Sequence, residues 1–340
     1  MTSRARLLAI GFGGLAMIAM AASLSVSIGS APIPLSAVWS IAANKISPGL
    51  IEPFWSAGRE NIVWNLRFPR VLLAIMVGAG LAMAGTAMQG AIRNPLADPH
   101  LLGVSAGAAF GANLAILVTG NIFGQATVPL FAFAGALAAT GLVVVTAVFA
   151  RGGIATLLLG GIAISFVISA GTNVMLVLAD PRAVANVVFW MFGGFGFAQW
   201  GNLAFPAIAL LVAGSVFLAN ARQLNALAMG DETAGTLGIP VSALRFLLLT
   251  ASAFLTGVMV AFSGMIGFVG LMMPHIARLL VGGDNRFVLP VGAILGSVFL
   301  VLADLAARTV VAPNELPIGV VTGLVGGLFF IALLRGRAAR

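Results

Sequence analysis

The sequence predicts an all-α, polytopic membrane protein, and three observations lead to this prediction. Hydrophobic residues make up 61% of the 340 residues and charged residues only 8%, whereas soluble domains carry about 25% charged residues. Apolar runs of about 20 residues, long enough to cross a bilayer as helices, recur between short polar connections. Alternating segments of about 10 residues, which a membrane β-barrel requires, are not seen, so we expect a helical bundle.

We predict ten transmembrane helices, with boundaries accurate to a few residues. They lie near residues 7–30, 70–90, 101–120, 127–150, 154–179, 204–221, 242–263, 266–282, 287–309 and 316–334. The first run follows Arg4 and Arg6, as the core of a signal peptide does. It is longer than the ~7–15 residues of such a core, so we interpret it as a transmembrane helix. Residues 1–340 are expected to form a single transmembrane domain.

Basic residues indicate the orientation of the bundle. If the N-terminus lies inside, 11 of the 17 lysines and arginines fall on the inner side: Arg4, Arg6, Arg93, Arg151, Arg222, Arg245, Arg278, Arg286, Arg335, Arg337 and Arg340. The other 6 fall on the outer side: Lys45, Arg59, Arg67, Arg70, Arg182 and Arg308. Because basic residues are enriched on the cytoplasmic side, both termini are predicted to be cytoplasmic. The net charge of +8 therefore reflects topology in a lipid bilayer and not nucleic-acid binding.

Residues 31–64 form the longest polar connection and are predicted to be an outer loop or short interfacial helices. Arg67 and Arg70 follow on either side of Phe68 and Pro69, and proline fits the first turn of a helix. Residues three apart share a helix face, so both guanidinium groups are expected together at the outer membrane surface. They either anchor the helix in lipid headgroups or receive the carboxylates of a partner, which arginine binds in a bidentate way.

Glycines recur at intervals of four in several spans, which lets transmembrane helices approach closely. Examples are Gly103, Gly107 and Gly111, and also Gly292 and Gly296. A stripe of this kind is a packing signal and carries no chemistry. The bundle is therefore predicted to be dense and rigid.

Two Pro-His pairs, Pro99–His100 and Pro274–His275, predict helix breaks, because proline removes a backbone donor and crowds the preceding turn. Their similar surroundings predict inverted repeats, with helices two to five matching helices seven to ten, as in many transporters. These are the only histidines, and cysteine is absent. Two histidines make a poor metal site, so we expect no metal and expect the rings to hydrogen-bond the broken backbone.

Two short segments carry signals of their own. Residues 189–197 mix Phe, Trp, Met and Gly and are too short to cross a membrane, so they are predicted to form a short outer helix or re-entrant segment at a pore mouth, or an interfacial anchor. Residues 229–240 have acids first and glycines last, which are signals for a short helix on the cytoplasmic face, with a plain loop as the alternative. Asp304 and Arg308 are four apart in the order that favours an ion pair.

The chain shows no energy source of its own. The phosphate-binding loop G-x-x-x-x-G-K-[ST] needs a lysine after glycine, and the only lysine, Lys45, follows Asn44. Ion-coupled carriers bury ionisable groups in mid-membrane, and the best candidate, Asp304, is predicted near a helix end. An intramembrane hydrolase needs a nucleophile with a base, and no such set is visible. We predict a gated path without cofactors that other subunits operate, not an enzyme.

Four motifs in order resemble one family. They are RFPR, NPLADPHLLGVSAGA, GFVGLMMPHIARLLVG and ELPIGVVTGLVGG. They closely resemble the FecCD type of permease subunit, which belongs to binding-protein-dependent, ATP-driven bacterial importers of vitamin B12, ferric siderophores and haem. The resemblance covers essentially the whole chain after the first helix and implies the large, ten-helix permease fold.

The resemblance also implies roles for three sets of residues. The outer arginines that receive carboxylates of a periplasmic binding protein match Arg67, Arg70 and Arg308. The coupling region that docks on an ATPase matches residues 224–240, with the candidates Gly230, Asp231, Glu232, Thr233, Ala234, Gly235, Thr236, Leu237 and Gly238. The mouth of the translocation path matches Phe189, Trp190, Met191, Phe192, Gly193, Gly194 and Phe195. The implied partners are two ATP-binding subunits and a second copy of the permease, in the bacterial inner membrane.

The cargo is less specified than the role. An iron(III)-siderophore is our first expectation, because that subgroup of the family is the broadest, and haem and cobalamin are the alternatives. An ion-coupled secondary carrier is the alternative from another class. A structural membrane scaffold without a transported solute is a third interpretation, which the helix breaks disfavour.

Overall fold

The computed structural model describes residues 3–29, 31–150 and 152–338, and these residues form helices and connections without a strand. Residue 30, the last of the first predicted span, and Arg151 and Arg340, two of the arginines used to predict orientation, lie outside the described residues. The α-helices are α1 (Ser3–Ser27), α2 (Leu35–Ile46), α3 (Ala57–Asn61), α4 (Phe68–Ile92), α5 (Val104–Leu114), α6 (Thr127–Phe149), α7 (Ile154–Leu178), α8 (Pro181–Met191), α9 (Ala204–Ala219), α10 (Ala221–Ala228), α11 (Asp231–Thr236), α12 (Val241–Ser263), α13 (Val269–Val281), α14 (Asn285–Thr309) and α15 (Ile318–Ala338).

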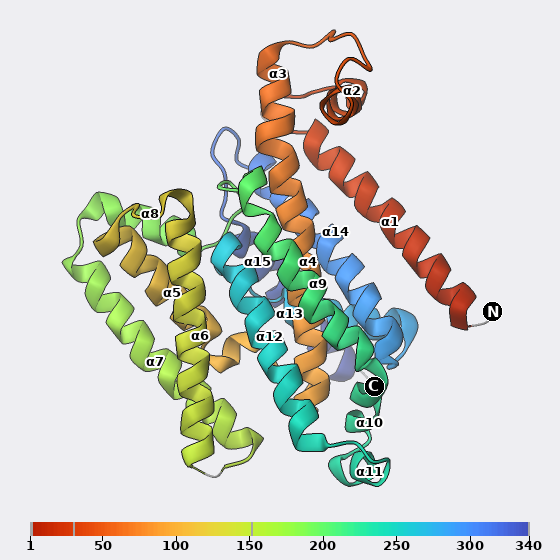
Figure 1. The fold of residues 1–340 in the computed structure, drawn as a ribbon, viewed down its shortest axis with the longest axis vertical. Coiled ribbons are helices and arrows are strands. Elements are labelled where there is room, and N and C mark those ends of the chain that lie inside the picture. Colours follow the sequence, from red (N-terminus) through yellow and green to blue (C-terminus); the bar gives the residue numbers. More distant parts are fainter. Residues whose placement is uncertain (1–2, 30, 151, 339–340) are drawn as a thin grey trace.

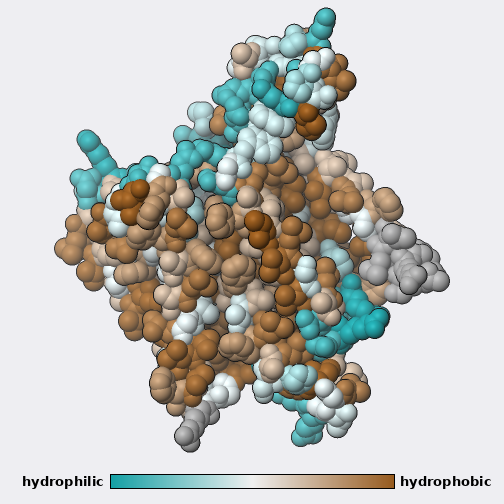
Figure 2. Space-filling view, viewed as in Figure 1, coloured by the Kyte–Doolittle hydropathy of each residue, from teal (hydrophilic) through white to brown (hydrophobic). Residues whose placement is uncertain are grey.

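The predicted ten passages are present in the described part of the chain. Eight helices are long and apolar enough to span a membrane, and two shorter apolar helices, Val104–Thr119 and Val269–Val281, take the places of the third and eighth predicted spans. The side surface of the molecule is a hydrophobic band, with hydrophilic residues gathered toward its two ends (Figure 2). This is the surface expected of a bundle immersed in a bilayer.

The segment predicted as an outer loop is largely helical. It contains α2, α3 and a π-helical stretch, Ile62–Arg67, that runs directly into α4, so that residues 57–92 form one continuous rod (Figure 1). Pro69 lies in the first turn of α4, and because the rod continues through this position, proline removes one backbone donor inside a helix. The π-helical stretch has wider turns than an α-helix. It extends the helix on the N-terminal side of the boundary predicted at residue 70.

Helix α4 is the centre of the fold. Most of its residues are buried, and it packs against α9, α12, α13 and α14, whereas α5, α6, α7 and α8 form a group beside it (Figure 1). A methyl group on Gly78 would overlap the carbonyl oxygen of Gly296 in α14, and one on Gly85 would overlap that of Gly270 in α13. These glycines let the helix backbones touch, as the glycine spacing predicts.

The predicted inverted repeats imply an exchange of neighbours between the halves. In the structure α4 packs against α13 and α14, and α12, its predicted counterpart, packs against α5 and α6. The equivalent pairs α5–α6 and α13–α14 also pack together. Equivalent helices of the two predicted repeats thus make equivalent contacts, and the inverted relation itself stays a prediction.

The second predicted break is misplaced by several residues. Pro274 lies inside α13, and the interruption comes earlier, between Gly264 and Phe268, both of which have positive φ angles of 67° and 68°. Pro274 leaves the carbonyl of Gly270 without its helical donor. Nε2 of Gln89 in α4 donates to that oxygen at 3.0 Å. A side chain from a neighbouring helix thus allows proline to stay within a helix.

Candidate functional site

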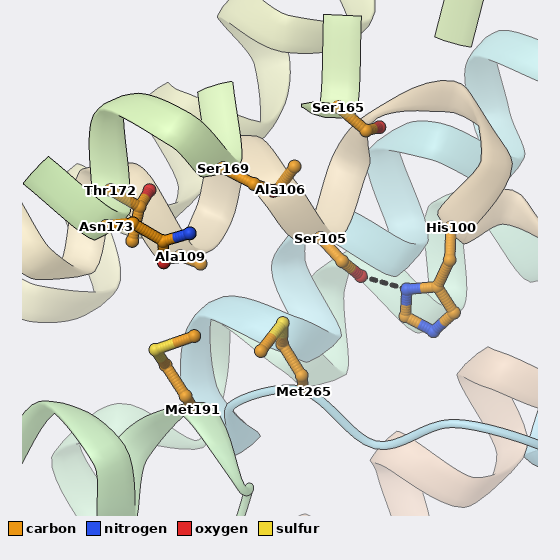
Figure 3. A pocket seen from close by; sticks show the side chains of 10 residues that line it. All are labelled: His100, Ser105, Ala106, Ala109, Ser165, Ser169, Thr172, Asn173, Met191 and Met265. Atoms are coloured by element: carbon orange, nitrogen blue, oxygen red, sulfur yellow. Dashed lines mark hydrogen bonds between the residues drawn. The ribbon is translucent and has the colours of Figure 1, made fainter. Parts of the chain in front are cut away.

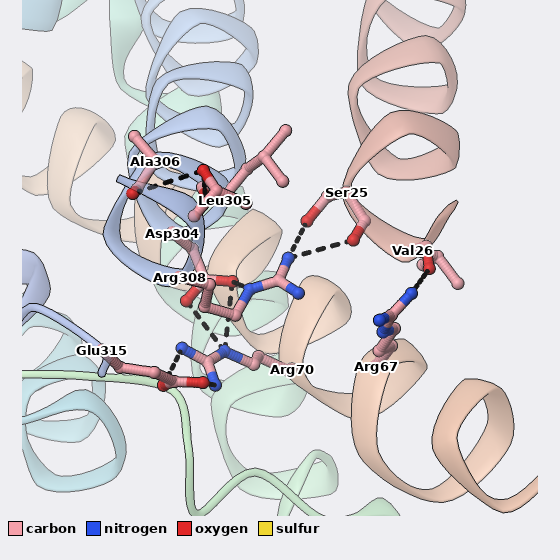
Figure 4. A network of polar contacts seen from close by, with 10 residues as sticks. Ser25, Val26, Arg67, Arg70, Asp304, Leu305, Ala306, Arg308 and Glu315 are labelled. Carbon is pink, nitrogen blue, oxygen red and sulfur yellow. Dashed lines mark hydrogen bonds and ion pairs between the residues drawn. The ribbon is translucent and has the colours of Figure 1, made fainter. Parts of the chain in front are cut away.

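Arg67 joins two helices at one end of the bundle, which we call the Arg70 end. The Arg67 side chain is buried, at 6% exposed, and donates to the carbonyl oxygens of Val26, Ser27 and Ala31 at 2.6, 3.1 and 2.7 Å. These oxygens lie at and just beyond the C-terminus of α1, where carbonyls lack helical donors and a cation is favourable. Arg67 therefore holds α1 against the start of α4 (Figure 4).

Asp304 is the centre of a buried charge network at the same end (Figure 4). Its fully buried carboxylate accepts from Arg70 Nε at 2.8 Å and from Arg308 Nε at 3.0 Å. Arg308 also donates to the hydroxyl and the carbonyl of Ser25, at 2.7 and 3.0 Å. The predicted pair of Asp304 and Arg308 is confirmed, and the network connects α1, α4 and α14.

The expectation that Arg67 and Arg70 present their guanidinium groups together at the surface is wrong. Their side chains share the start of one rod, but Arg67 turns toward α1 and Arg70 toward α14. Arg308 is buried as well. The reason is that carbonyl and carboxylate groups from helices distant in sequence satisfy each arginine inside the chain. Among the three, Arg70 alone lines the large cavity described next.

A cavity of about 720 Å³ opens at the Arg70 end. Aromatic and amide side chains form much of its wall: Phe189, Trp190, Phe197, Phe262, Asn121, Gln125, Asn186, Gln199 and Asn202. Arg70, Glu315, Gly193 and Gly194 also line this cavity. Four of the seven predicted mouth residues, at positions 189, 190, 193 and 194, thus line this cavity.

A second pocket of about 280 Å³ lies farther along α5 (Figure 3). Ser105 and Ala109 line it, whereas Ile116 lines the large cavity, and seven helical residues correspond to about 10 Å. Its wall is rich in hydroxyl and amide groups, from Ser105, Ser165, Ser169, Thr172 and Asn173, and Met191 and Met265 line it as well. Ser165 and Thr172 donate to carbonyls of α7 itself, at 2.7 and 3.1 Å, whereas Ser169 and Asn173 are exposed on a membrane span, where lipid alone would not solvate them.

His100 also lines the small pocket. Its ring nitrogen Nδ1 is hydrogen-bonded to the hydroxyl of Ser105 (Figure 3), and its backbone N–H donates to Asp98 at 2.8 Å. The predicted bond from the ring to broken backbone is therefore replaced by one to a side chain. The ring of His275 packs edge-on against Phe329, with centroids 5.9 Å apart.

Two short segments separate the cavities, and we call them the seal: residues 190–194 and 263–265. Trp190 and Gly264 line the large cavity, and their chain neighbours Met191 and Met265 line the small pocket. The segments touch through their backbones, because the Gly194 N–H donates to the Ser263 carbonyl at 2.8 Å and a methyl group on Gly264 would overlap the Trp190 carbonyl. Only a backbone contact without side chains lets two segments approach this closely.

The opposite end of the bundle, the α11 end, carries the predicted short helix (Figure 1). Helix α11 begins at Asp231, whose carboxylate pairs with Arg245 at 2.8 Å and with Arg93 at 3.4 Å. Arg245 Nε also donates to the Ala91 carbonyl at 2.9 Å, near the end of α4. The hydrogen bond from Arg245 lowers the pKa of Asp231 below its usual value, so this carboxylate stays charged at neutral pH.

The connection that follows α13 is fastened by a similar carboxylate. Asp284 accepts from Arg286 and from Asn225 of α10, both at 2.7 Å. These bonds, that of Arg286 above all, lower the pKa of Asp284 to about 2. The carboxylate therefore remains charged throughout the physiological range, and it holds α10 against the start of α14.

The fold and its two cavities in series define a membrane permease. The profile of the FecCD transport family matches residues 15–336. The chain therefore belongs to the FecCD transport family and is an ABC importer permease.

Its relatives carry different cargoes by name. The cobalamin import system permease protein BtuC of Halobacterium salinarum is 42% identical over 83% of this chain and 75% of its own length. The hemin transport system permease protein HmuU of Yersinia pestis is 41% identical over 84% of this chain and 88% of its own length. The iron(3+)-hydroxamate import system permease protein FhuB of Bacillus subtilis is 37% identical over 95% of this chain and 82% of its own length. A solved inward-facing ABC transporter assigned to the metal-chelate type has a TM-score of 0.81, with 31% identity over 96% of this chain and 98% of that one.

Sequence reasoning missed the contacts between distant segments. Gly264 and Met265 are not among the predicted site residues, although Gly264 has a positive φ angle and lies in the interruption before α13. Glu315 gave no local signal, because its partner Arg70 is 245 residues away. The same is true of Arg245, which reaches α11 and α4 at once.

Proposed function

We propose that this chain is the permease subunit of an importer for an iron(III)-siderophore or a related metal chelate in the bacterial inner membrane. The Arg70 end faces outward, and both termini are cytoplasmic. The observation that carries the proposal is the pair of cavities in series, one open at the Arg70 end and one in mid-bundle, with the seal between them. A path with alternating access needs such an arrangement. Energy comes from two ATP-binding subunits.

A second copy of the chain completes the path in this proposal. Only 6% of the α7 span is buried within the chain, and its exposed residues include Ser169 and Asn173, which line the small pocket. Polar groups at that depth are favoured only against protein or a water-filled cavity. A partner copy packed along α7 places protein against these groups and encloses the small pocket.

Arg70 is the docking point for a carboxylate of the periplasmic binding protein. It is the one arginine of the predicted three that lines the large cavity, and Asp304 holds its Nε so that the guanidinium edge is fixed. Arg67 and Arg308, which were predicted for the same role, instead hold α1. We therefore place docking on Arg70. Arg67 and Arg308 hold the helices around Arg70 in position.

Changing Arg70 to glutamine is expected to weaken docking of the binding protein by at least about tenfold, because a hydrogen bond to a charged group contributes about 1.5–3 kcal/mol. Asp304 keeps Arg308 in this variant, so the fold is retained. The affinity is measured on the purified complex in detergent or nanodiscs, at two salt concentrations. Arg59→Gln removes an exposed arginine of the same end as the control, and equal affinities for the two variants would refute the assignment.

Helix α11 and its flanks, residues 224–240, couple the permease to the ATPase. The ion pairs of Asp231 tie α11 to the end of α4, so force applied to α11 reaches the central helix. Asp231→Ala is expected to lower uptake several-fold while the assembled complex continues to hydrolyse ATP. Arg222→Ala serves as the control, since Arg222 is exposed in α10 and lies outside residues 224–240. Equal uptake by the two variants would argue against this coupling route.

Uptake of labelled ferric siderophore, haem and cobalamin tests the cargo, in cells with and without this gene and with intact partner subunits. We expect loss of ferric siderophore uptake. Haem is the second candidate, because His100, Met191 and Met265 line the small pocket and histidine and methionine are side chains that ligate haem iron. Cobalamin is the third. Unchanged uptake of all three would point to another metal chelate as the cargo, and uptake driven by an ion gradient without ATPase subunits would favour a secondary carrier.

A further inference from the structure

Arg70 is shared between two carboxylates that differ in their freedom to move. Its Nε is bound to Asp304, whose side chain is 1% exposed. Its terminal nitrogens are bound to Glu315, with Nη2 2.9 Å from Oε2 and Nη1 3.3 Å from Oε1, and the Glu315 side chain is 52% exposed. Asp304 is therefore the permanent partner, and Glu315 is the partner that solvent or another carboxylate can replace.

Glu315 occupies the edge of Arg70 that an incoming carboxylate would use. A guanidinium group offers two terminal nitrogens as a fork for bidentate binding, and Glu315 takes this fork on the wall of the large cavity. A docking partner must compete with Glu315 for the same donors.

The backbone that follows Glu315 connects it to α14 and to the seal. The Leu316 N–H donates to the Ala307 carbonyl at 2.9 Å, which fixes the chain against α14. Ile318 and Gly319, the first residues of α15, donate to the carbonyls of Gly193 and Phe192 at 3.1 and 2.9 Å.

Breaking the hydrogen bonds of Ile318 and Gly319 to the seal would leave two backbone N–H groups without acceptors. The first N–H groups of a helix have no partner within it, and here the seal supplies their acceptors. A methyl group on Gly319 would overlap the Phe192 carbonyl, so the start of α15 lies directly against the seal. Movement of residues 315–319 is therefore transmitted to residues 190–194.

We propose that Glu315 is a positioning residue for transport: its ion pair with Arg70 keeps residues 315–319 against the seal, and a carboxylate that docks at Arg70 displaces Glu315 and loosens the seal. This inference rests on the proposed function, since it uses Arg70 as the docking point. It adds a residue and a route by which docking is communicated to the path between the two cavities.

The absence of cysteine from the chain provides a direct test. Met191→Cys places a single thiol on the face of the seal that lines the small pocket. The assembled transporter in sealed membranes is exposed to a membrane-impermeant maleimide on the Arg70 side. Adding Glu315→Gln is expected to raise the labelling rate by about two- to fivefold, the range that a partly exposed ion pair can contribute to an equilibrium. Glu315→Asp, which keeps the charge, is expected to restore part of the protection.

Glu60→Gln is the matched control. Glu60 lies at the same end and pairs with Lys45 at 2.7 Å, but it does not line either cavity. Its removal is expected to leave labelling of Cys at position 191 unchanged. Unchanged labelling in Glu315→Gln, or an equal increase in both glutamine variants, would overturn the proposal.

A second readout separates this proposal from the docking assignment. Glu315→Gln frees the fork of Arg70, so the affinity for the binding protein is expected to rise, whereas Arg70→Gln lowers it. Labelling needs no binding protein and reports the seal alone. If labelling rises in Glu315→Gln while Arg70→Gln leaves docking unchanged, the effect of Glu315 on the seal stands and the docking point is wrong. If docking depends on Arg70 and labelling does not change, the role of Glu315 is wrong.

Discussion

Replacing Asp304 with alanine is expected to destabilise the permease strongly. The carboxylate is fully buried between Arg70 and Arg308. Arg70 keeps Glu315 after the change, whereas the direct hydrogen-bond partners left to Arg308 are the neutral oxygens of Ser25. Removing one partner of a buried ion pair costs about 3–5 kcal/mol, because it leaves a charge without compensation. Thermal unfolding of the purified transporter in detergent measures this loss.

Two further variants test the physical reason for this loss. Asp304→Leu combined with Arg308→Met removes both charges, and it is expected to regain much of the stability, because apolar replacement of a buried pair is often neutral. Glu60→Ala breaks a partly exposed pair, which contributes at most about 1 kcal/mol, and it is expected to change the midpoint little. A double variant as unstable as Asp304→Ala would show that packing of these side chains, and not charge burial, holds this end together.

Much of the fold follows from local patterns in the sequence. Hydrophobic run length predicts the ten passages, because each span must satisfy its own backbone in lipid. The spacing of Asp304 and Arg308 predicts their ion pair, since four residues bring side chains to one helix face. The acids and glycines around α11 predict a short helix. Each of these features depends on residues within a single helix and its immediate flanks.

The candidate site depends instead on contacts between distant residues. Pro274 predicts a backbone carbonyl without its helical donor, but nothing in the sequence indicates that Gln89 donates to it. The buried position of Arg67 depends on carbonyls about 40 residues earlier. The surface position predicted for Arg67 rests on its charge alone. Hydropathy does not include the hydrogen-bond partners that compensate for burying a charged group. The seal likewise forms between backbones, which leave little trace in residue types.

Changing Gly78 to alanine is the second large expected effect. Gly78 and Gly296 face each other across α4 and α14, and a methyl group on either would overlap the carbonyl oxygen of the other. The atoms that either methyl group would overlap belong to the backbone, so no side chain can rotate away to make room. Overpacking a dense interior costs about 1–3 kcal/mol, and here it separates the two helices that hold the charge network of Asp304. We expect a lower unfolding midpoint and weaker uptake.

Gly141→Ala is the matched control for this change. Gly141 lies inside α6, and a methyl group there has no atom of this chain within 4 Å. Alanine is favoured over glycine in a helix interior by about 0.8–1 kcal/mol, so the same substitution should leave stability equal or higher. The sign of the effect therefore separates close helix packing from helix propensity. A loss of stability at both positions would mean that α6 is packed against a further surface, and no loss at Gly78 would contradict the close contact of α4 with α14.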